Sequence, residues 1–136
     1  MLIEVTSKPI SPESVVNRVK TDSSGCVVTY VGLIRKYSQD KPVLSVAYQD
    51  IDGTAEKKLY EIAAETMQKW QVNNIAICHR TGKLKVGYIN LVVAIAAAHR
   101  EEGFAACRYV IDRFKERLPT RKTETYEDGS THIGEE

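Results

Sequence analysis

Four basic side chains accompany one helical segment. The most apolar run in the chain leads into His99 and Arg100, and Lys115 follows about four helical turns later. Pro119 ends the helix because proline has no N–H to donate and restricts the residue before it. Lys122 therefore falls on the segment that leaves the helix. Because a first helical turn offers unpaired N–H groups, the spacing predicts an anion site at the helix start, completed by the two lysines.

Apolar residues at three- and four-residue steps predict which face of this helix is buried. They are Phe104, Cys107, Ile111, Phe114 and Leu118. The basic residues flank that face, and spacing alone leaves two interpretations open. They form either a functional anion pocket or the solvated edge of an amphipathic helix, whose start Glu101 and Glu102 already favour.

A further cation, Arg35, follows a β-branched and aromatic segment. Residues 26–34 predict a central strand, and Gly32 within it predicts a bulge or a close backbone approach. Arg35 is either a second arm of the anion site or a strand-end cation, and spacing does not decide between them. The polar residues 37–42 predict a loop.

The cysteines and His79 favour structural roles. Cys26, Cys78 and Cys107 lie in apolar runs without CxxC spacing, which predicts buried free thiols. Their odd number and the absence of a signal peptide indicate a reducing, cytoplasmic location. Cys107 is a poor candidate nucleophile because it falls on the apolar helix face. His79, at a strand end, is expected to be a hydrogen-bonded structural residue.

Composition and pattern predict one α+β domain over residues 1–136. The chain is 43% hydrophobic and 27% charged with a net charge of +1, which argues against bulk nucleic-acid or membrane binding. The predicted sheet is mixed and mainly antiparallel, with about three helices. Helices are expected to begin at Ser11–Pro12, Thr54 and Arg100, and strands at 2–6, 26–34, 43–48, 74–81, 88–98, 122–126 and 130–133.

Common catalytic motifs are absent from the sequence. It contains no GxxxxGK[ST], GxGxxG, HExxH or GxSxG. The three histidines are not spaced as zinc ligands, and no cysteine cluster accompanies them. We therefore expect no metal and no cofactor.

Several segments in one order carry a resemblance to a known family. They are residues 25–35 (GCVVTYVGLIR), 55–59 (AEKKL), 77–82 (ICHRTG) and 98–100 (AHR), followed by Lys115, Pro119, Lys122 and Glu124 at their observed spacing. The chain resembles the MoaE family, the large, catalytic subunit of molybdopterin synthase, from about Pro9 to about Ile133. The resemblance implies a fold of the α/β-hammerhead type.

The resemblance also implies an activity and partners. The family converts cyclic pyranopterin monophosphate into molybdopterin during molybdenum cofactor biosynthesis. The enzyme is a sulfurtransferase whose sulfur arrives on the thiocarboxylated C-terminus of a small, ubiquitin-like subunit of the MoaD type. Two large subunits form a homodimer that carries one small subunit at each end, giving a heterotetramer.

Position by position, the family's substrate-binding cations correspond to Arg35, His99, Arg100, Lys115 and Lys122. The arginines and His99 would bind the substrate phosphate. The implied general base or acid is Lys115, with Lys122 assisting it or stabilising developing negative charge. Acylation of Lys115 by the partner's tail is a less favoured alternative.

Some positions depart from the family pattern. Thr120 and Arg121 stand where an apolar residue and then a tryptophan are usual, residues 47–51 differ from the usual acidic and aromatic segment, and Thr54 replaces a methionine. These departures leave an alternative open, a divergent non-catalytic member that binds the ubiquitin-like partner or a pterin. A nucleic-acid-binding domain is the least favoured reading, because the basic residues are scattered.

Overall fold

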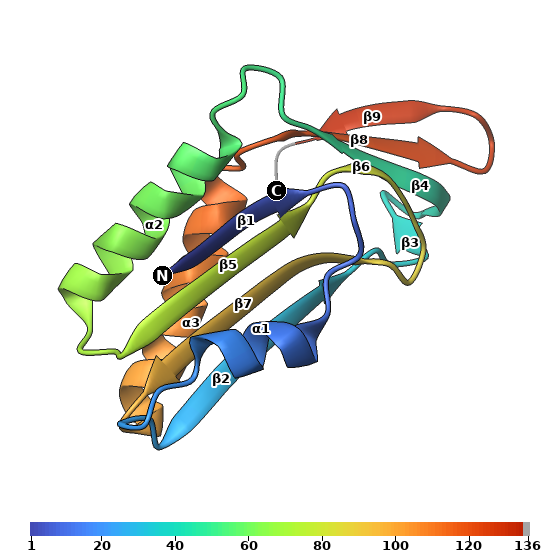
Figure 1. The fold of residues 1–136 in the computed structure, drawn as a ribbon. Coiled ribbons are helices and arrows are strands. Elements are labelled where there is room, and N and C mark those ends of the chain that lie inside the picture. The colour runs from blue at the N-terminus through green and yellow to red at the C-terminus, as the bar shows by residue number, and fades with distance from the viewer. Residues whose placement is uncertain (135–136) are drawn as a thin grey trace.

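The chain folds into two sheets and three helices over residues 1–134, which the computed structural model describes (Figure 1). Residues 135 and 136 of the predicted domain lie outside the described residues. The elements are β1 (Leu2–Thr6), α1 (Pro12–Val19), β2 (Cys26–Leu33), β3 (Tyr37–Ser38), β4 (Lys41–Gln49), α2 (Ala55–Lys69), β5 (Asn74–Arg80), β6 (Gly82–Lys85), β7 (Ile89–Ala97), α3 (Arg100–Glu116), β8 (Arg121–Tyr126) and β9 (Thr131–Gly134). Among these helices, none is long and apolar enough to cross a membrane.

The first sheet has the strand order β1-β5-β7-β2 and carries the main core. Only β1 and β5 are parallel, so the predicted mixed and mainly antiparallel pairing is confirmed for this sheet. Helices α2 and α3 cover one face and α1 covers the other (Figure 1). Strand β7 is buried on both faces, which explains its continuous apolar sequence.

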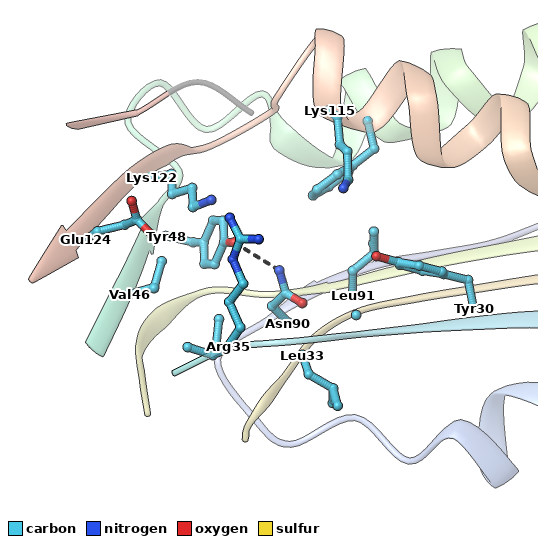
Figure 2. A pocket seen from close by; sticks show the side chains of 13 residues that line it. Tyr30, Leu33, Arg35, Val46, Tyr48, Asn90, Leu91, Lys115, Lys122 and Glu124 are labelled. Carbon is cyan, nitrogen blue, oxygen red and sulfur yellow. Dashed lines mark hydrogen bonds between the residues drawn. The ribbon is translucent and has the colours of Figure 1, made fainter. Parts of the chain in front are cut away.

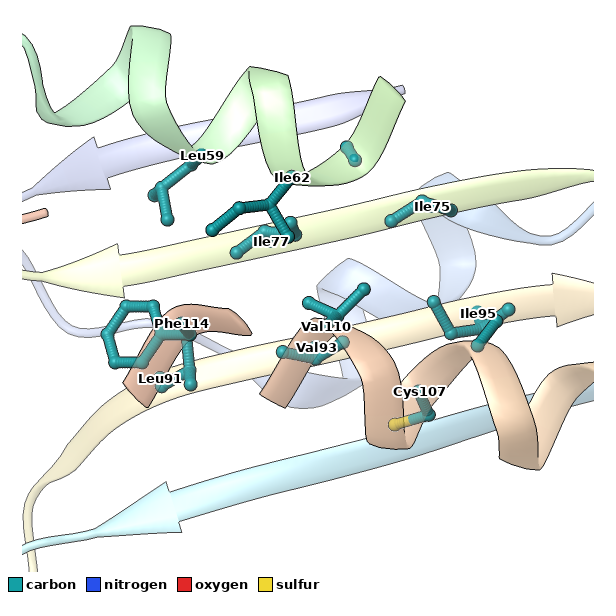
Figure 3. Packing of buried hydrophobic residues seen from close by; sticks show 12 residues of the cluster. Leu59, Ile62, Ile75, Ile77, Leu91, Val93, Ile95, Cys107, Val110 and Phe114 are labelled. Atoms are coloured by element: carbon teal, nitrogen blue, oxygen red, sulfur yellow. The ribbon is translucent and has the colours of Figure 1, made fainter. Parts of the chain in front are cut away.

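The larger core lies between this sheet and the pair α2 and α3. Leu59 and Ile62 of α2 meet Val110 and Phe114 of α3 above the apolar side chains of β5 and β7 (Figure 3). On the opposite face, Val15 and Val19 of α1 belong to a separate cluster with side chains of β5 and β7. The alternation of side chains along a strand sends successive residues to these two cores.

Strand β2 lies at the edge of the described sheet, so its predicted central position is wrong. Its β-branched sequence reflects burial under α3, because Val28 and Tyr30 pack against the main core. Val27 packs on the opposite face, against the cluster that contains the side chains of α1. Because side chains of β2 pack on both faces, the strand has the composition of an inner strand, and only long-range pairing decides its neighbours. Val31 and Leu33 remain exposed along this edge.

The second sheet has the order β3-β4-β8-β9, with β6 also paired to β4. Gln39 and Asp40 both have positive φ, at 54° and 59°, and they join β3 to β4 in a tight hairpin. The predicted loop over 37–42 is therefore a short hairpin. The predicted return strand after Asp128 and Gly129 is confirmed by the β8–β9 pairing.

Helix α3 is rotated relative to the predicted face. Phe104 is 62% exposed, so its assignment to the buried face is wrong, whereas Cys107 and Phe114 are buried as predicted. Gly103 faces the sheet instead, and a Cβ at this position would lie only 2.9 Å from Val28 Cγ2. A small residue here lets the helix approach β2 closely, which turns its neighbour Phe104 toward solvent.

Candidate functional site

A cavity of about 400 Å³ lies where the two sheets meet the C-terminal end of α3 (Figure 2). Its wall combines the end of β2, the start of β7, the last turn of α3, and strands β4 and β8. The polar and charged side chains in this wall are Tyr30, Arg35, Tyr48, Asn90, Lys115, Lys122 and Glu124.

Three of the five predicted cations line this cavity. Arg35 follows β2, Lys115 projects from the last turn of α3, and Lys122 is the second residue of β8. Burial of Lys122 lowers the pKa of its amine, and the neighbouring charges of Arg35 and Lys115 lower it further, while Glu124 opposes the shift. The cavity is therefore suited to an anionic ligand and holds an amine that deprotonates more readily than an ordinary lysine.

His99 and Arg100 lie elsewhere in the chain. They line a separate depression with Gly25, at the N-terminal end of α3. Since a helix rises 1.5 Å per residue, Arg100 is about 22 Å along α3 from Lys115. The anion site predicted at the helix start, completed by Lys115 and Lys122, is therefore not formed within one chain, because the length of α3 separates its two ends.

Glu124, the buried acid of the cavity, was not predicted as a site residue. Its side chain is 6% exposed, and its Oε1 accepts hydrogen bonds from Ser38 Oγ at 3.0 Å and Tyr126 Oη at 3.1 Å. These two donors anchor a carboxylate within a basic cavity. The predicted strand over residues 122–126 could have indicated Glu124. Side chains two residues apart in a strand share a face, and Lys122 was already a predicted site residue.

Tyr48 and Asn90 form a pair in the cavity wall that was also not predicted from the sequence. Asn90 Nδ2 donates to Tyr48 Oη at 2.9 Å (Figure 2), and burial raises the pKa of Tyr48 to about 12. The phenol thus stays protonated at neutral pH, with its own O–H left to donate. Asn90 Oδ1 has no hydrogen-bond partner among residues 1–134.

Gly32 makes room for this pair. A Cβ on Gly32 would lie 2.8 Å from Asn90 Oδ1, and the pairing of β2 with β7 shifts register between Gly32 and Leu33. The predicted bulge or close backbone approach at Gly32 is therefore confirmed.

The structural role predicted for His79 is confirmed. The side chain is fully buried, and its ring nitrogens lie 2.9 Å from the Asn90 carbonyl oxygen and 2.9 Å from Thr120 Oγ1. Burial lowers the pKa of His79 to about 4, against a weaker opposing effect of the hydrogen bond to Asn90 and the charge of Asp50. The imidazole is therefore neutral at neutral pH.

This burial makes stability depend on pH. Because the pKa of His79 is about 4 in the folded state against 6.5 as its ordinary value, the unfolded chain binds more protons between these limits. His79 therefore stabilises the fold fully above about pH 6.5, and we expect about 2 to 3 kcal/mol of this to be lost by pH 4.5.

Urea unfolding at pH 7.5 and pH 4.5 measures this loss. His79→Gln removes the titrating group, so its free energy of unfolding should fall less between the two pH values than that of the wild type. Carboxylates titrate in both proteins and cancel in the comparison. Equal losses in the two proteins would contradict the assignment.

Two of the cysteines are buried as predicted. Burial raises the pKa of Cys78 to about 11 and that of Cys107 to about 11, so both are protonated thiols at neutral pH. Cys26 is half-buried, with its Sγ 3.6 Å from the Ala97 carbonyl oxygen. Neither Cys78 nor Cys107 lines the cationic cavity.

The fold and the cavity define an α+β protein with a cationic cavity at the junction of two sheets. Residues 5–117 match the family model described as MoaE protein, and the chain belongs to the MoaE family.

Similar proteins agree with this assignment. A molybdopterin synthase catalytic subunit from Nostoc sp. is 41% identical over 93% of this chain and 78% of its own length. Molybdopterin synthase from Staphylococcus aureus is 29% identical and superposes with a TM-score of 0.91 over 98% of this chain and 97% of that one. A chain in a complex of subunits 1 and 2 of molybdopterin-converting factor from Helicobacter pylori, 11% identical with a TM-score of 0.75 over 98% and 90%, shares the fold. The predicted single-domain α+β class is thereby confirmed.

Proposed function

We propose that this chain is the large, catalytic subunit of a molybdopterin synthase. It would convert cyclic pyranopterin monophosphate into molybdopterin by sulfur transfer from the thiocarboxylated C-terminus of a small, ubiquitin-like subunit. The observation that carries this proposal is the cavity that gathers Arg35, Lys115 and Lys122 in a member of this family. The reducing cytoplasm predicted from the cysteines belongs to the same proposal.

The cavity charges suit both reactants. The substrate carries a cyclic phosphate and the partner's tail carries a thiocarboxylate, so each brings negative charge to the basic wall. Arg35 offers a planar fork of N–H donors that binds such groups in a bidentate manner. Tyr48 and Asn90 add neutral polar groups for a heterocyclic ring.

The electrostatics favour Lys122 as the proton acceptor. An amine accepts a proton only when it is neutral, and Lys122 is the half-buried lysine whose lowered pKa makes that form accessible. Lys115 is exposed at the mouth of the cavity. We assign to it the stabilisation of negative charge that develops during acyl transfer, which reverses the two roles expected from the resemblance alone.

In a two-fold dimer, His99 and Arg100 of one chain would lie at the cavity of the other chain. The depression that holds them adjoins the start of β2, and Arg35 follows the end of β2. The seven steps from Cys26 to Leu33 span about 24 Å, which matches the distance of about 22 Å along α3 between Arg100 and Lys115. Antiparallel pairing of β2 with its two-fold copy would therefore set the depression of one chain against the cavity of the other.

The surface along β2 supports such a dimer. Val31, Leu33 and Phe104 are 38%, 58% and 62% exposed, and an edge strand with apolar neighbours is suited to pairing with a second chain. In this arrangement the five cations of the predicted site surround one substrate but come from two chains.

Two of the departures from the family pattern, Thr120 and Arg121, lie outside the cavity wall, whereas Tyr48 of the departing segment 47–51 is part of it. Thr120 and Arg121 line a neighbouring groove, with Lys115 between this groove and the cavity. The loss of the usual tryptophan therefore leaves the cationic wall intact. This arrangement favours the catalytic subunit over the alternative, a non-catalytic binding module.

The proposal is tested by product formation. Purified protein, cyclic pyranopterin monophosphate and a thiocarboxylated small subunit should yield molybdopterin, and the same small subunit with an ordinary carboxylate should yield none. A folded protein that binds the small subunit but forms no product would favour the non-catalytic alternative.

A further inference from the structure

His79 lies behind the cavity, at the meeting point of several elements. From β5, its ring makes edge-on contacts with the ring of Tyr48 on β4, at 4.9 Å between centroids, and with that of Phe114 on α3, at 5.1 Å. Tyr48 and Phe114 both line the cavity, and Phe114 directly precedes Lys115. The imidazole therefore supports the wall without reaching the ligand space.

The two hydrogen bonds of His79 determine its tautomer. The Asn90 carbonyl oxygen can only accept, so His79 Nδ1 must carry the proton and donate to it. Nε2 of the neutral ring is then an acceptor, and the hydroxyl of Thr120 donates to it. Through these two hydrogen bonds, His79 connects the start of β7 to the segment between α3 and β8.

The hydrogen bond of Thr120 to His79 lies directly before β8, the strand that carries two of the cavity residues. Lys122 and Glu124 are two residues apart in β8 and share one face of the strand, and Thr120 lies in the bend two residues before Lys122. Thr120 and Glu124 are each 6% exposed. The hydrogen bond between Thr120 and His79 therefore restrains the bend two residues before Lys122. The contact between the rings of His79 and Phe114 restrains the end of α3 beside Lys115.

We propose that His79 and Thr120 form a positioning pair that fixes Lys122, and its spacing from Lys115, in the cavity. The catalytic consequence of this inference rests on the proposed function, whereas the placement of Lys122 does not. Neither residue of the pair lines the cavity, so both act through the side chains that they hold.

The matched variants Thr120→Val and Thr120→Ser test the pair. Valine keeps the shape of threonine but removes the hydroxyl, which leaves the buried Nε2 without a donor, whereas serine keeps the donor. Thr66→Val is the control, because it removes another buried hydroxyl, one that donates to the Ile62 carbonyl oxygen at 2.7 Å in α2.

The readout is the pH dependence with which acetic anhydride labels the amine of Lys122 in the absence of substrate, measured by mass spectrometry against exposed Lys83. In the wild type, Thr120→Ser and Thr66→Val, Lys122 should label at a lower pH than Lys83. In Thr120→Val we expect its half-maximal labelling to move to higher pH, toward that of Lys83, since Lys122 loses its half-buried position. An unchanged Lys122 profile in folded Thr120→Val would overturn the inference.

A measurement on the wild type keeps the inference testable if Thr120→Val does not fold. Nitrogen-15 NMR of His79 should show the Nδ1–H tautomer at neutral pH, and the Nε2–H tautomer would overturn the pair. For the reaction, Thr120→Val should lower kcat at least tenfold with little change in KM, and Thr120→Ser should restore it. Labelling and NMR require no substrate. If the wild type were inactive, the proposed function would be contradicted, and the labelling and NMR results would still decide whether His79 and Thr120 position Lys122.

Discussion

Lys122→Arg will lower kcat for molybdopterin formation by about 10²- to 10⁴-fold, the usual contribution of a general base. The arginine retains the positive charge, but its guanidinium stays protonated at any working pH and cannot accept a proton. Lys115→Arg should retain much more activity, because the role proposed for Lys115 requires charge at the mouth of the cavity. The pair of variants therefore separates proton transfer from charge stabilisation at two lysines of one cavity.

Steady-state kinetics with the thiocarboxylated small subunit measures this difference. Lys20→Arg, at an exposed position after α1, is the control and should leave kcat unchanged. Thermal unfolding should show that each variant is folded. If Lys115→Arg lost as much activity as Lys122→Arg, the assignment of the base to Lys122 would be wrong.

A heterodimer of Lys122→Ala and Arg100→Ala chains will recover about half of the wild-type activity, because a two-fold dimer has two equivalent sites. Each homodimer is expected to be strongly impaired, since every site would lack either the proposed base or the proposed phosphate-binding arginine. In the heterodimer, the cavity with an intact Lys122 faces the chain with an intact Arg100. One complete site is thereby formed, although each chain carries a defect.

The opposite combination provides the control. A heterodimer of wild type with the double variant Lys122→Ala and Arg100→Ala has one defect in each site and should remain impaired. If Arg100 instead served the cavity of its own chain, this control would be half active and the first heterodimer inactive. Chains carrying different affinity tags, purified in tandem, give the heterodimers needed for both assays.

Local features of the fold could be predicted from the sequence because they depend on residues within a turn of one another. Ser11 was expected to begin a helix, and its Oγ accepts a hydrogen bond from the Ser14 N–H at 3.2 Å. Pro119 was expected to end α3, which stops at Glu116. The chemical identity of the cavity cations was equally local, since Arg35, Lys115 and Lys122 each follow or end a predictable element.

Features that depend on long-range contacts were decided by the tertiary structure. Strand β2 has the composition of an inner strand, but its pairing leaves it at the sheet edge. The close approach at Gly103 turns Phe104 outward. The length of α3 separates Arg100 from Lys115. Spacing in the sequence does not show whether the residues of one site come from one chain or from two.

The sequence by itself determined the α+β class and the main helices and strands, and its resemblance to the MoaE family singled out three of the charges in the cavity. Only the tertiary structure decided which lysine is desolvated, because burial and neighbouring charge shift the pKa of Lys122 and both arise from residues distant in the chain. The same is true of Tyr48, Asn90 and Glu124, whose roles arise from hydrogen bonds between elements, and of the particular partners of His79, whose structural role was predicted. Propensity and periodicity act over a few residues, whereas desolvation and hydrogen-bond partners depend on the packed fold.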